Sequence, residues 1–206
     1  MYTTYQKYPG FNNIEIVAEL EAPRRKQPVL KPVTTGNKIQ RLDFKPENLN
    51  RHLRPENAHS QSSVLIRKLS QGLLVISFYS KAWGTYGLKY LRQLNELQQE
   101  IDILGGQLLI VTPDAADNHL AEVIWDYSLN LHFYFDPANI IANKFGIYAG
   151  NMPAWNNYSG IENNIPLLAT YVIDSFYKVL FSHVDEKLLS DISKKELLHV
   201  LKGERF

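Results

Sequence analysis

The sequence predicts an α/β fold in which a mixed central sheet lies between layers of helices, preceded by an extended N-terminal arm. Three observations lead to this fold class. From residue 63 onward, apolar segments of strand length alternate with segments in which apolar residues recur every three or four positions. The last two strand-like segments follow each other without a helix between them. Residues 1–62 differ from the rest, since they carry six of the ten prolines and no sustained periodicity.

The N-terminal arm, residues 1–62, carries ten basic and six acidic residues. Phosphate binding needs basic residues concentrated in a stripe, whereas these are scattered and only Arg24–Lys26 are contiguous. We therefore expect the arm to wrap the body or a partner subunit, and we expect no nucleic-acid partner. Two short pieces of the arm, Ile14–Leu20 and Lys38–Phe44, alternate in the manner of strands.

The first half of the body has the pattern of helix, strand, helix and strand. Ser63–Leu69 predicts a short helix, and Leu73–Tyr79 is almost continuously apolar, as in a strand buried on both faces. Leucine and isoleucine then recur at intervals of three and four from Leu88 to Leu104, which predicts a long amphipathic helix closed by two glycines. Gln107–Thr112 is a second apolar strand, which ends at a proline.

The second half of the body continues the alternation and then changes. Residues 117–128 predict a helix, Leu131–Phe135 a third strand, and Asn139–Phe145 a short helix stopped by a glycine. Ala169–Asp174 and Lys178–Val184 are joined by a tight turn, so they predict an antiparallel hairpin.

The last predicted helix is Ser193–Leu201, with Ser193 as its N-cap and Glu196 in the position of a capping box. Alternating strands and helices imply parallel strands with right-handed crossovers and helices on both faces of the sheet. A terminal hairpin followed by a helix narrows this to a thioredoxin-like three-layer α/β/α sandwich, and we assign residues 63–206 to that domain.

The composition excludes several classes of function. With 22 basic and 21 acidic residues, the chain has no global field that would draw it to nucleic acid or to an acidic surface. It has no cysteine, which excludes disulfides, cysteine-ligated metals and a thiolate nucleophile. Its start lacks a signal-peptide pattern, and Leu73–Tyr79 is far shorter than the about 20 residues that span a bilayer. We expect a cytoplasmic protein with no membrane partner.

One segment carries a resemblance to a known family. Residues 78–87 read FYSKAWGTYG and lead into the long helix, and they resemble the active-site segment F-Y-x-x-x-W-C-P-Y-C of AhpC/TSA peroxiredoxin-like proteins. Three more stretches match the family in order: 105–113, 135–146 and 169–185. The resemblance covers about residues 63–201 and implies the peroxiredoxin-like variant of the thioredoxin-like fold.

The departures from the family pattern bear on function. Gly84 and Gly87 stand where the family segment has its two cysteines. In the wider pattern P-x-x-x-T/S-x-x-C, Ser80 stands at the proline, and Gly87 again occupies the position of the peroxide-attacking cysteine. Such enzymes use a thiolate at a helix N-terminus and resolve the resulting sulfenic acid with a second thiol. This chain therefore cannot carry out thiol peroxidase or disulfide-exchange chemistry with its own residues.

The segment around the two glycines retains candidates for a binding groove. We expect Thr85 to be the N-cap of the long helix, which leaves N–H groups able to hold an anion. Trp83 and Tyr86 would flank the groove and contact a peptide or a flat ligand, although the same residues would also serve as ordinary packing.

Two further regions could line the same groove. The family has a proline, often cis, directly before its fourth strand; that position is Leu168 here, and the nearby proline is Pro166. The loop of residues 153–160 carries Trp155 and Tyr158, and two exposed aromatic side chains would make it a candidate binding loop, or a cover for the core or for a dimer interface.

We expect no metal and no cofactor. The six histidines show no i, i+4 pair and no H-E-x-x-H spacing. His183 and Asp185 lie on the same face of the predicted hairpin, where the ordinary interpretation is a surface pair, and Ser80 and Lys81 resemble a Ser/Lys dyad only by adjacency.

Three functional hypotheses follow. The leading one is a catalytically degenerate protein that works by binding a protein or small ligand, or by assembly as a homodimer. The second is an enzyme or ligand-binding protein with a non-thiol site in the same groove. The third is an accessory component of a peroxide response that relies on a thiol-bearing partner.

Overall fold

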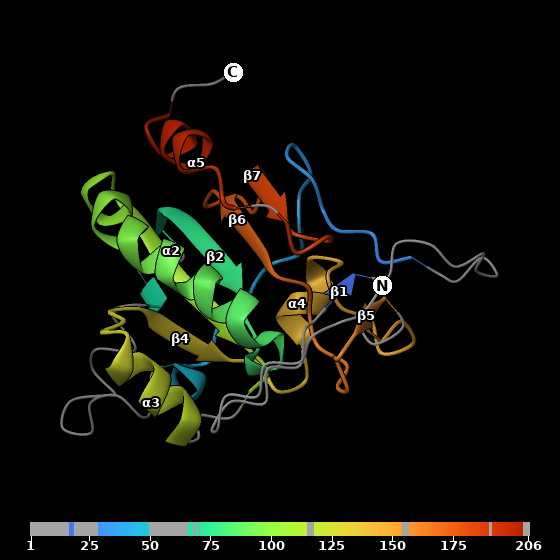
Figure 1. Cartoon of the computed structure of the whole chain (residues 1–206). Helices are drawn as coiled ribbons and strands as arrows, with labels where there is room; N and C mark the ends of the chain where they lie inside the picture. The colour runs from blue at the N-terminus through green and yellow to red at the C-terminus, as the bar shows by residue number, and fades with distance from the viewer. Residues whose placement is uncertain are drawn as a thin grey trace.

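The computed structural model describes residues 17–18, 29–49, 66–67, 69, 71–114, 118–153, 157–189 and 191–203. Its main sheet has five strands in the order β4-β3-β2-β6-β7 (Figure 1). The strands are β2 (Leu73–Phe78), β3 (Gly106–Thr112), β4 (His132–Phe135), β6 (Ala169–Ile173) and β7 (Val179–Val184). The helices are α2 (Gly84–Ile103), α3 (Asn118–Asp126), α4 (Ile140–Lys144) and α5 (Lys194–Leu201).

The sheet is mixed, as predicted. Strand β2 pairs in parallel with β3, and β3 in parallel with β4, whereas β6 runs antiparallel to both β2 and β7. The central strands are buried on both faces, which is why their sequences lack the alternation of a half-exposed strand. The α/β element order and the terminal hairpin are therefore confirmed.

Helices cover both faces of the sheet. The Thr170 hydroxyl reaches Tyr90 on α2, whereas the next residue, Tyr171, packs its ring against Phe145 at the end of α4. Because successive side chains of a strand point to opposite faces, α2 and α4 lie on opposite sides of the sheet. Helix α5 lies on the α2 side, where Lys194 forms an ion pair with Glu100 of α2. Among the helices of the described residues, none is both long and apolar enough to cross a membrane.

Two helix starts are fixed by side-chain caps. The Ser193 hydroxyl accepts a hydrogen bond from the Glu196 backbone N–H at the start of α5, which confirms the predicted N-cap. At α4, the buried Asp136 carboxylate accepts the N–H groups of Ile140 and Ile141. A carboxylate there satisfies otherwise unpaired N–H groups and complements the helix dipole, so it stabilises a helix of only five residues.

The described part of the arm between residues 29 and 49, here called the strap, lies across the α4 face of the sheet (Figure 1). The predicted strand Lys38–Phe44 is wrong, because only Lys38 forms a bridge, with Lys178. In this stretch Ile39 and Leu42 are buried and the residues between them are exposed. A spacing of three does not match the two-residue period of a strand, so the chain leaves β7 after one bridge and crosses the face.

Two other predictions for the N-terminal half are only partly covered by the described residues. Within Ile14–Leu20, Val17–Ala18 form β1, which pairs antiparallel with β5 (Tyr158–Ser159). Within Ser63–Leu69, the described residues Ile66, Arg67 and Leu69 are helical. The predicted division after residue 62 falls in a stretch that the structure does not describe, so it stays a prediction.

Candidate functional site

The segment Ser80–Gly87, here called the glycine corner, follows the carboxyl end of β2 and includes the first turn of α2. It begins with a 3₁₀ turn, η2 (Lys81–Trp83). The Ser80 hydroxyl accepts a hydrogen bond from the Ala82 N–H at 3.2 Å, and the Trp83 N–H donates to the Ser80 carbonyl at 3.1 Å. A serine at this position therefore fixes the turn from which α2 begins.

Gly84 has a backbone conformation that other residues rarely adopt. Its φ is 53° and its ψ is −129°. A Cβ atom strains the backbone in this region, so a side chain here costs about 1–3 kcal/mol. A cysteine at the first of the two family positions would therefore be strained in this corner.

Gly87 excludes a side chain for a different reason. A Cβ atom built there would lie 2.9 Å from the Tyr79 ring, 3.1 Å from the Trp83 Cβ and 3.2 Å from the Ser80 carbonyl oxygen. Tyr79 and Trp83 are buried, and the carbonyl belongs to the η2 turn, so these neighbours have little room to move. Core side chains of the protein therefore fill the space next to Gly87, where the family segment has its second cysteine.

Trp83 is a core residue, which corrects the expectation that it flanks an open groove. Its side chain is fully buried. The indole Nε1–H donates to the Pro166 carbonyl at 2.9 Å, and the ring packs edge-on against Tyr158 with centroids 5.0 Å apart. The Tyr158 hydroxyl in turn donates to the Glu186 carbonyl at 2.7 Å. Trp83 thus anchors the corner to the loop before β6.

Thr85 is not the N-cap of α2, so that prediction is wrong. The helix starts at Gly84 and its N-cap is Trp83, two residues before the predicted one, and the Trp83 side chain makes no capping hydrogen bond. Thr85 is exposed in the first turn, whereas Tyr86 is half-buried and packs against the core. The exposed residues of the corner are therefore Lys81, Gly84 and Thr85.

Pro166 and Leu168 are both buried, which corrects their assignment to a binding groove. The Pro166 carbonyl holds the Trp83 indole, and the Leu168 carbonyl accepts the Asp185 N–H at 3.0 Å. The peptide bonds of the described residues are all trans, including that of Pro166. The structure therefore brings Trp83 and Pro166 together, but as packing partners.

The predicted binding loop is only partly described. Trp155 lies outside the described residues. Tyr158 lies in β5, and it is buried rather than exposed because its ring packs against the Trp83 ring. The expectation of two exposed aromatic side chains in this loop is therefore wrong for Tyr158.

Asp114 belongs to the corner, although the sequence analysis did not select it. Its carboxylate accepts the Lys81 N–H at 2.6 Å and the Ser80 hydroxyl at 3.3 Å, and it also contacts the Thr112 hydroxyl at 3.3 Å. Asp114 follows β3, whose carboxyl end lies beside that of its parallel neighbour β2. The expected adjacency of these two parallel strands is the sequence signal from which Asp114 could have been selected. A carboxylate at this point disfavours a second anion at the start of the corner.

A chain of buried hydroxyl groups connects β2, β6 and α2. The Thr170 hydroxyl donates to the Tyr90 oxygen at 3.1 Å and lies 2.9 Å from the Ser77 hydroxyl, which donates to the Ala169 carbonyl. Burial raises the pKa of Tyr90 far above its ordinary value, and burial does the same to the pKa of Tyr158. Both phenols stay protonated at neutral pH, so neither is a general base.

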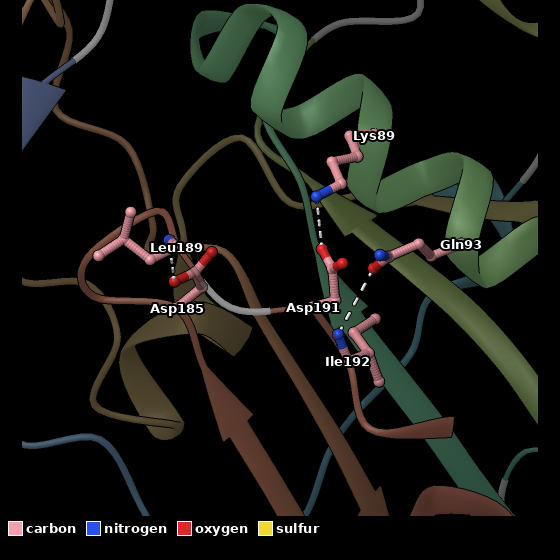
Figure 2. A network of polar contacts seen from close by, with 6 residues as sticks. All are labelled: Lys89, Gln93, Asp185, Leu189, Asp191 and Ile192. Atoms are coloured by element: carbon pink, nitrogen blue, oxygen red, sulfur yellow. Dashed lines mark hydrogen bonds and ion pairs between the residues drawn. The ribbon is translucent and has the colours of Figure 1, made fainter. Parts of the chain in front are cut away.

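A polar network ties the loop after β7 to α2 (Figure 2). The Asp185 carboxylate accepts the Leu189 N–H at 3.0 Å. Lys89 forms an ion pair with Asp191 at 2.6 Å, and its hydrogen bond is the main cause that lowers the pKa of Asp191, with Gln93 second. These contacts close the loop against the helix, which is a structural role.

His183 stacks on Tyr90, with ring centroids 6.1 Å apart and planes inclined by 23°. It therefore packs beside α2, and Asp185 is buried rather than exposed on the hairpin surface as expected. Within the described part of the chain, no group of three or more His, Asp or Glu side chains could hold a metal ion.

Comparisons with known proteins agree with this architecture. Residues 48–182 match the AhpC/TSA family. The structure is similar to peroxidoxin BcpB from Mycobacterium tuberculosis, with a TM-score of 0.54 and 21% identity over 69% of this chain and 86% of that one. It is also similar to a cysteine-to-serine mutant of peroxiredoxin 6 from Arenicola marina, with a TM-score of 0.57 and 13% identity over 82% of this chain and 72% of that one.

A peroxiredoxin-like protein from Aquifex aeolicus gives a TM-score of 0.51 and 15% identity over 64% of this chain and 71% of that one. No curated protein sequence matches the chain. At these identities the structural likeness establishes the fold, so the predicted thioredoxin-like architecture is confirmed.

Proposed function

Because this chain is a member of the AhpC/TSA family and contains no cysteine, we propose that it acts by binding or assembly rather than by thiol chemistry. The observation that carries the proposal is the geometry of the two glycines. Gly84 has a φ of 53°, and a Cβ on Gly87 would lie 2.9 Å from the Tyr79 ring. The corner is thus built around the absence of side chains at both positions.

The rest of the corner supports a scaffold role. Trp83 is held by Pro166 and Tyr158, and the η2 turn is held by Ser80 and Asp114. These contacts immobilise the segment that would carry a nucleophile in an enzyme of this family, yet the described residues place no activated nucleophile or free base in it. Such a corner still holds its surface in a fixed conformation that a partner could contact.

We propose a homodimer as the form in which the chain acts. Several large apolar side chains are exposed on the described surface, among them Trp125 of α3 at 85% and Phe176 of the β6–β7 turn at 73%. Contact with another protein surface would remove these apolar side chains from water. Homo-oligomers are also common in the resembled family.

The test is the molar mass of the purified chain by light scattering coupled to size-exclusion chromatography, over a hundredfold range of concentration. We expect a mass of twice the chain's 23.7 kDa. A monomer at every concentration would contradict the homodimer, and the binding proposal would then rest on a different partner.

The second candidate is a small-ligand site at the glycine corner. It is favoured by the exposure of Gly84 and Thr85 at the start of a 20-residue helix; the Gly84 N–H donates to the Lys81 carbonyl, and the N–H groups that follow it have no partner within the helix. A thermal-shift screen discriminates the two candidates. A ligand shift that disappears in Tyr86→Ala supports the corner site, whereas Trp83→Ala is a poor probe because Trp83 is a buried core residue.

A further inference from the structure

The two edge strands of the main sheet contain no charged residue and no proline, although β4 is only four residues long and the β6–β7 pairing is irregular at Val172/Ile173. Strand β4 reads HFYF and β7 reads VLFSHV, so neither contains lysine, arginine, aspartate, glutamate or proline. Natural edge strands are commonly protected by such residues, by bulges, or by a covering segment. Because both strands lack charges and proline, a covering segment would be their main further protection.

The strap pairs with β7 through its backbone. The Gly36 N–H donates to the Val179 carbonyl at 2.8 Å, and the Val179 N–H donates to the Asn37 carbonyl at 2.8 Å. The Ile39 N–H donates to the Tyr177 carbonyl at 2.9 Å. Further along, the Thr35 N–H reaches the Ser182 hydroxyl at 3.2 Å. The hydrogen-bonding groups at the start of β7 are thus already used within the chain.

The same strap reaches β4 at the opposite edge of the sheet. Leu49 forms an antiparallel bridge with Tyr134, and the Lys45 N–H donates to the Tyr134 hydroxyl at 3.1 Å. The Phe44 ring packs edge-on against the Tyr134 ring at 5.1 Å. Figure 1 shows the blue segment passing behind the sheet, from the β7 side to the β4 side. One segment therefore contacts both edges, at the start of β7 and at Tyr134 of β4.

Gly146 allows the strap to lie this close to the body. Its φ is 68°, and a Cβ atom there would overlap the Lys31 carbonyl oxygen. Directly beside it, the Val33 N–H donates to the Phe145 carbonyl at 2.9 Å. Because the obstructing atoms belong to the backbone, a side chain at residue 146 would push the strap away from α4.

The contact with β7 contains a feature that weakens it. Lys38 and Lys178 are partners in the antiparallel bridge, and both are exposed. Like charges directly opposite each other on paired strands are unfavourable, more so at low ionic strength. The strap is therefore held to β7 by backbone hydrogen bonds against a charge repulsion.

We propose that the strap is an intramolecular cover that prevents both sheet edges from pairing with a second copy of the chain, and that release of residues 36–39 from β7 opens that edge to self-association. The occupant is a second copy because identical apolar edge strands are matched in length and pattern. The inference rests on the assembly part of the proposed function and specifies which surfaces are closed in the isolated chain.

Gly146→Ala tests the proposal, with Gly150→Ala as the matched control, because nothing lies within 4 Å of a Cβ at Gly150. In Gly146→Ala we expect amide hydrogen exchange at Gly36, Ile39 and Val179 to be at least tenfold faster than in wild type. Light scattering should show a mass above that of wild type, whatever the wild-type state is. Gly150→Ala should match wild type in both measurements. Faster exchange without a rise in mass would overturn the proposal.

A surface variant keeps the test valid if Gly146→Ala does not fold. Lys38→Glu places opposite charges at the bridge, so exchange at Gly36 and Val179 should slow several-fold at low salt, and self-association should decrease or stay absent. Lys45→Glu makes the same change of charge away from Lys178 and should leave that exchange unchanged. Equal effects of the two variants would contradict the proposal. A monomeric wild type would count against the proposed homodimer alone.

Discussion

Gly84→Ala perturbs the glycine corner at the one residue whose backbone angles require glycine. With φ at 53° and ψ at −129°, an alanine Cβ introduces strain of about 1–3 kcal/mol. Alanine also lowers the conformational entropy of the unfolded chain relative to glycine, which stabilises the folded state by about 0.4–1 kcal/mol. We therefore expect the free energy of unfolding to fall by about 1–2 kcal/mol, which lowers the melting temperature by roughly 2–8 °C in a chain of this size.

The measurement is urea denaturation followed by circular dichroism, with Gly150→Ala as the control for the glycine-to-alanine change itself. We expect Gly150→Ala to lie within about 0.5 kcal/mol of wild type, because its Cβ meets no atom within 4 Å. If Gly84→Ala proves as stable as wild type with an unchanged denaturant slope, the corner does not depend on glycine and the geometric argument against a cysteine at this position fails.

Two other predictions concern groups outside the corner. Tyr171→Phe removes a buried hydroxyl that has no hydrogen-bond partner among the described residues but keeps the ring contacts with Phe78 and Phe145, so we expect stability to stay equal or to rise by about 1 kcal/mol. A loss above about 1 kcal/mol in urea denaturation would show that the hydroxyl is bonded. Asp191→Asn tests the Lys89 ion pair: because the folded-state pKa of Asp191 is lowered from 3.8, its stabilising effect is present above that pH and lost as the pH falls below it. Wild type should be slightly more stable than the variant at pH 7, and the difference should shrink as the pH falls from 3.8 through the lowered folded-state pKa; a difference that does not shrink on acidification would contradict the electrostatic origin.

Much of the fold follows from periodicity. The strand over residues 73–79, the helix ending near Leu104 and the N-cap at Ser193 are local signals, and the structure places each within a few residues of its predicted position. The features that periodicity did not predict depend on tertiary contacts. The strap alternates like a strand over Lys38–Phe44, but the burial of Ile39 and Leu42 against the sheet face overrides that pattern.

The candidate site shows the same division. The two glycines and their consequence for thiol chemistry could be inferred from the sequence. The burial of Trp83 could not, because it depends on Pro166 and Tyr158, which lie more than 70 residues away along the chain. Asp114 was missed because its partners, Ser80 and Lys81, meet it only through the pairing of β2 with β3.

The central claim is that this chain performs no thiol chemistry, and hydrogen peroxide consumption by the purified protein tests it most directly. The assay supplies dithiothreitol as reductant and includes a cysteine-containing peroxiredoxin as positive control. We expect the rate to equal that of the buffer at every protein concentration. A rate that rises in proportion to protein concentration, and that heat denaturation abolishes, would contradict the account.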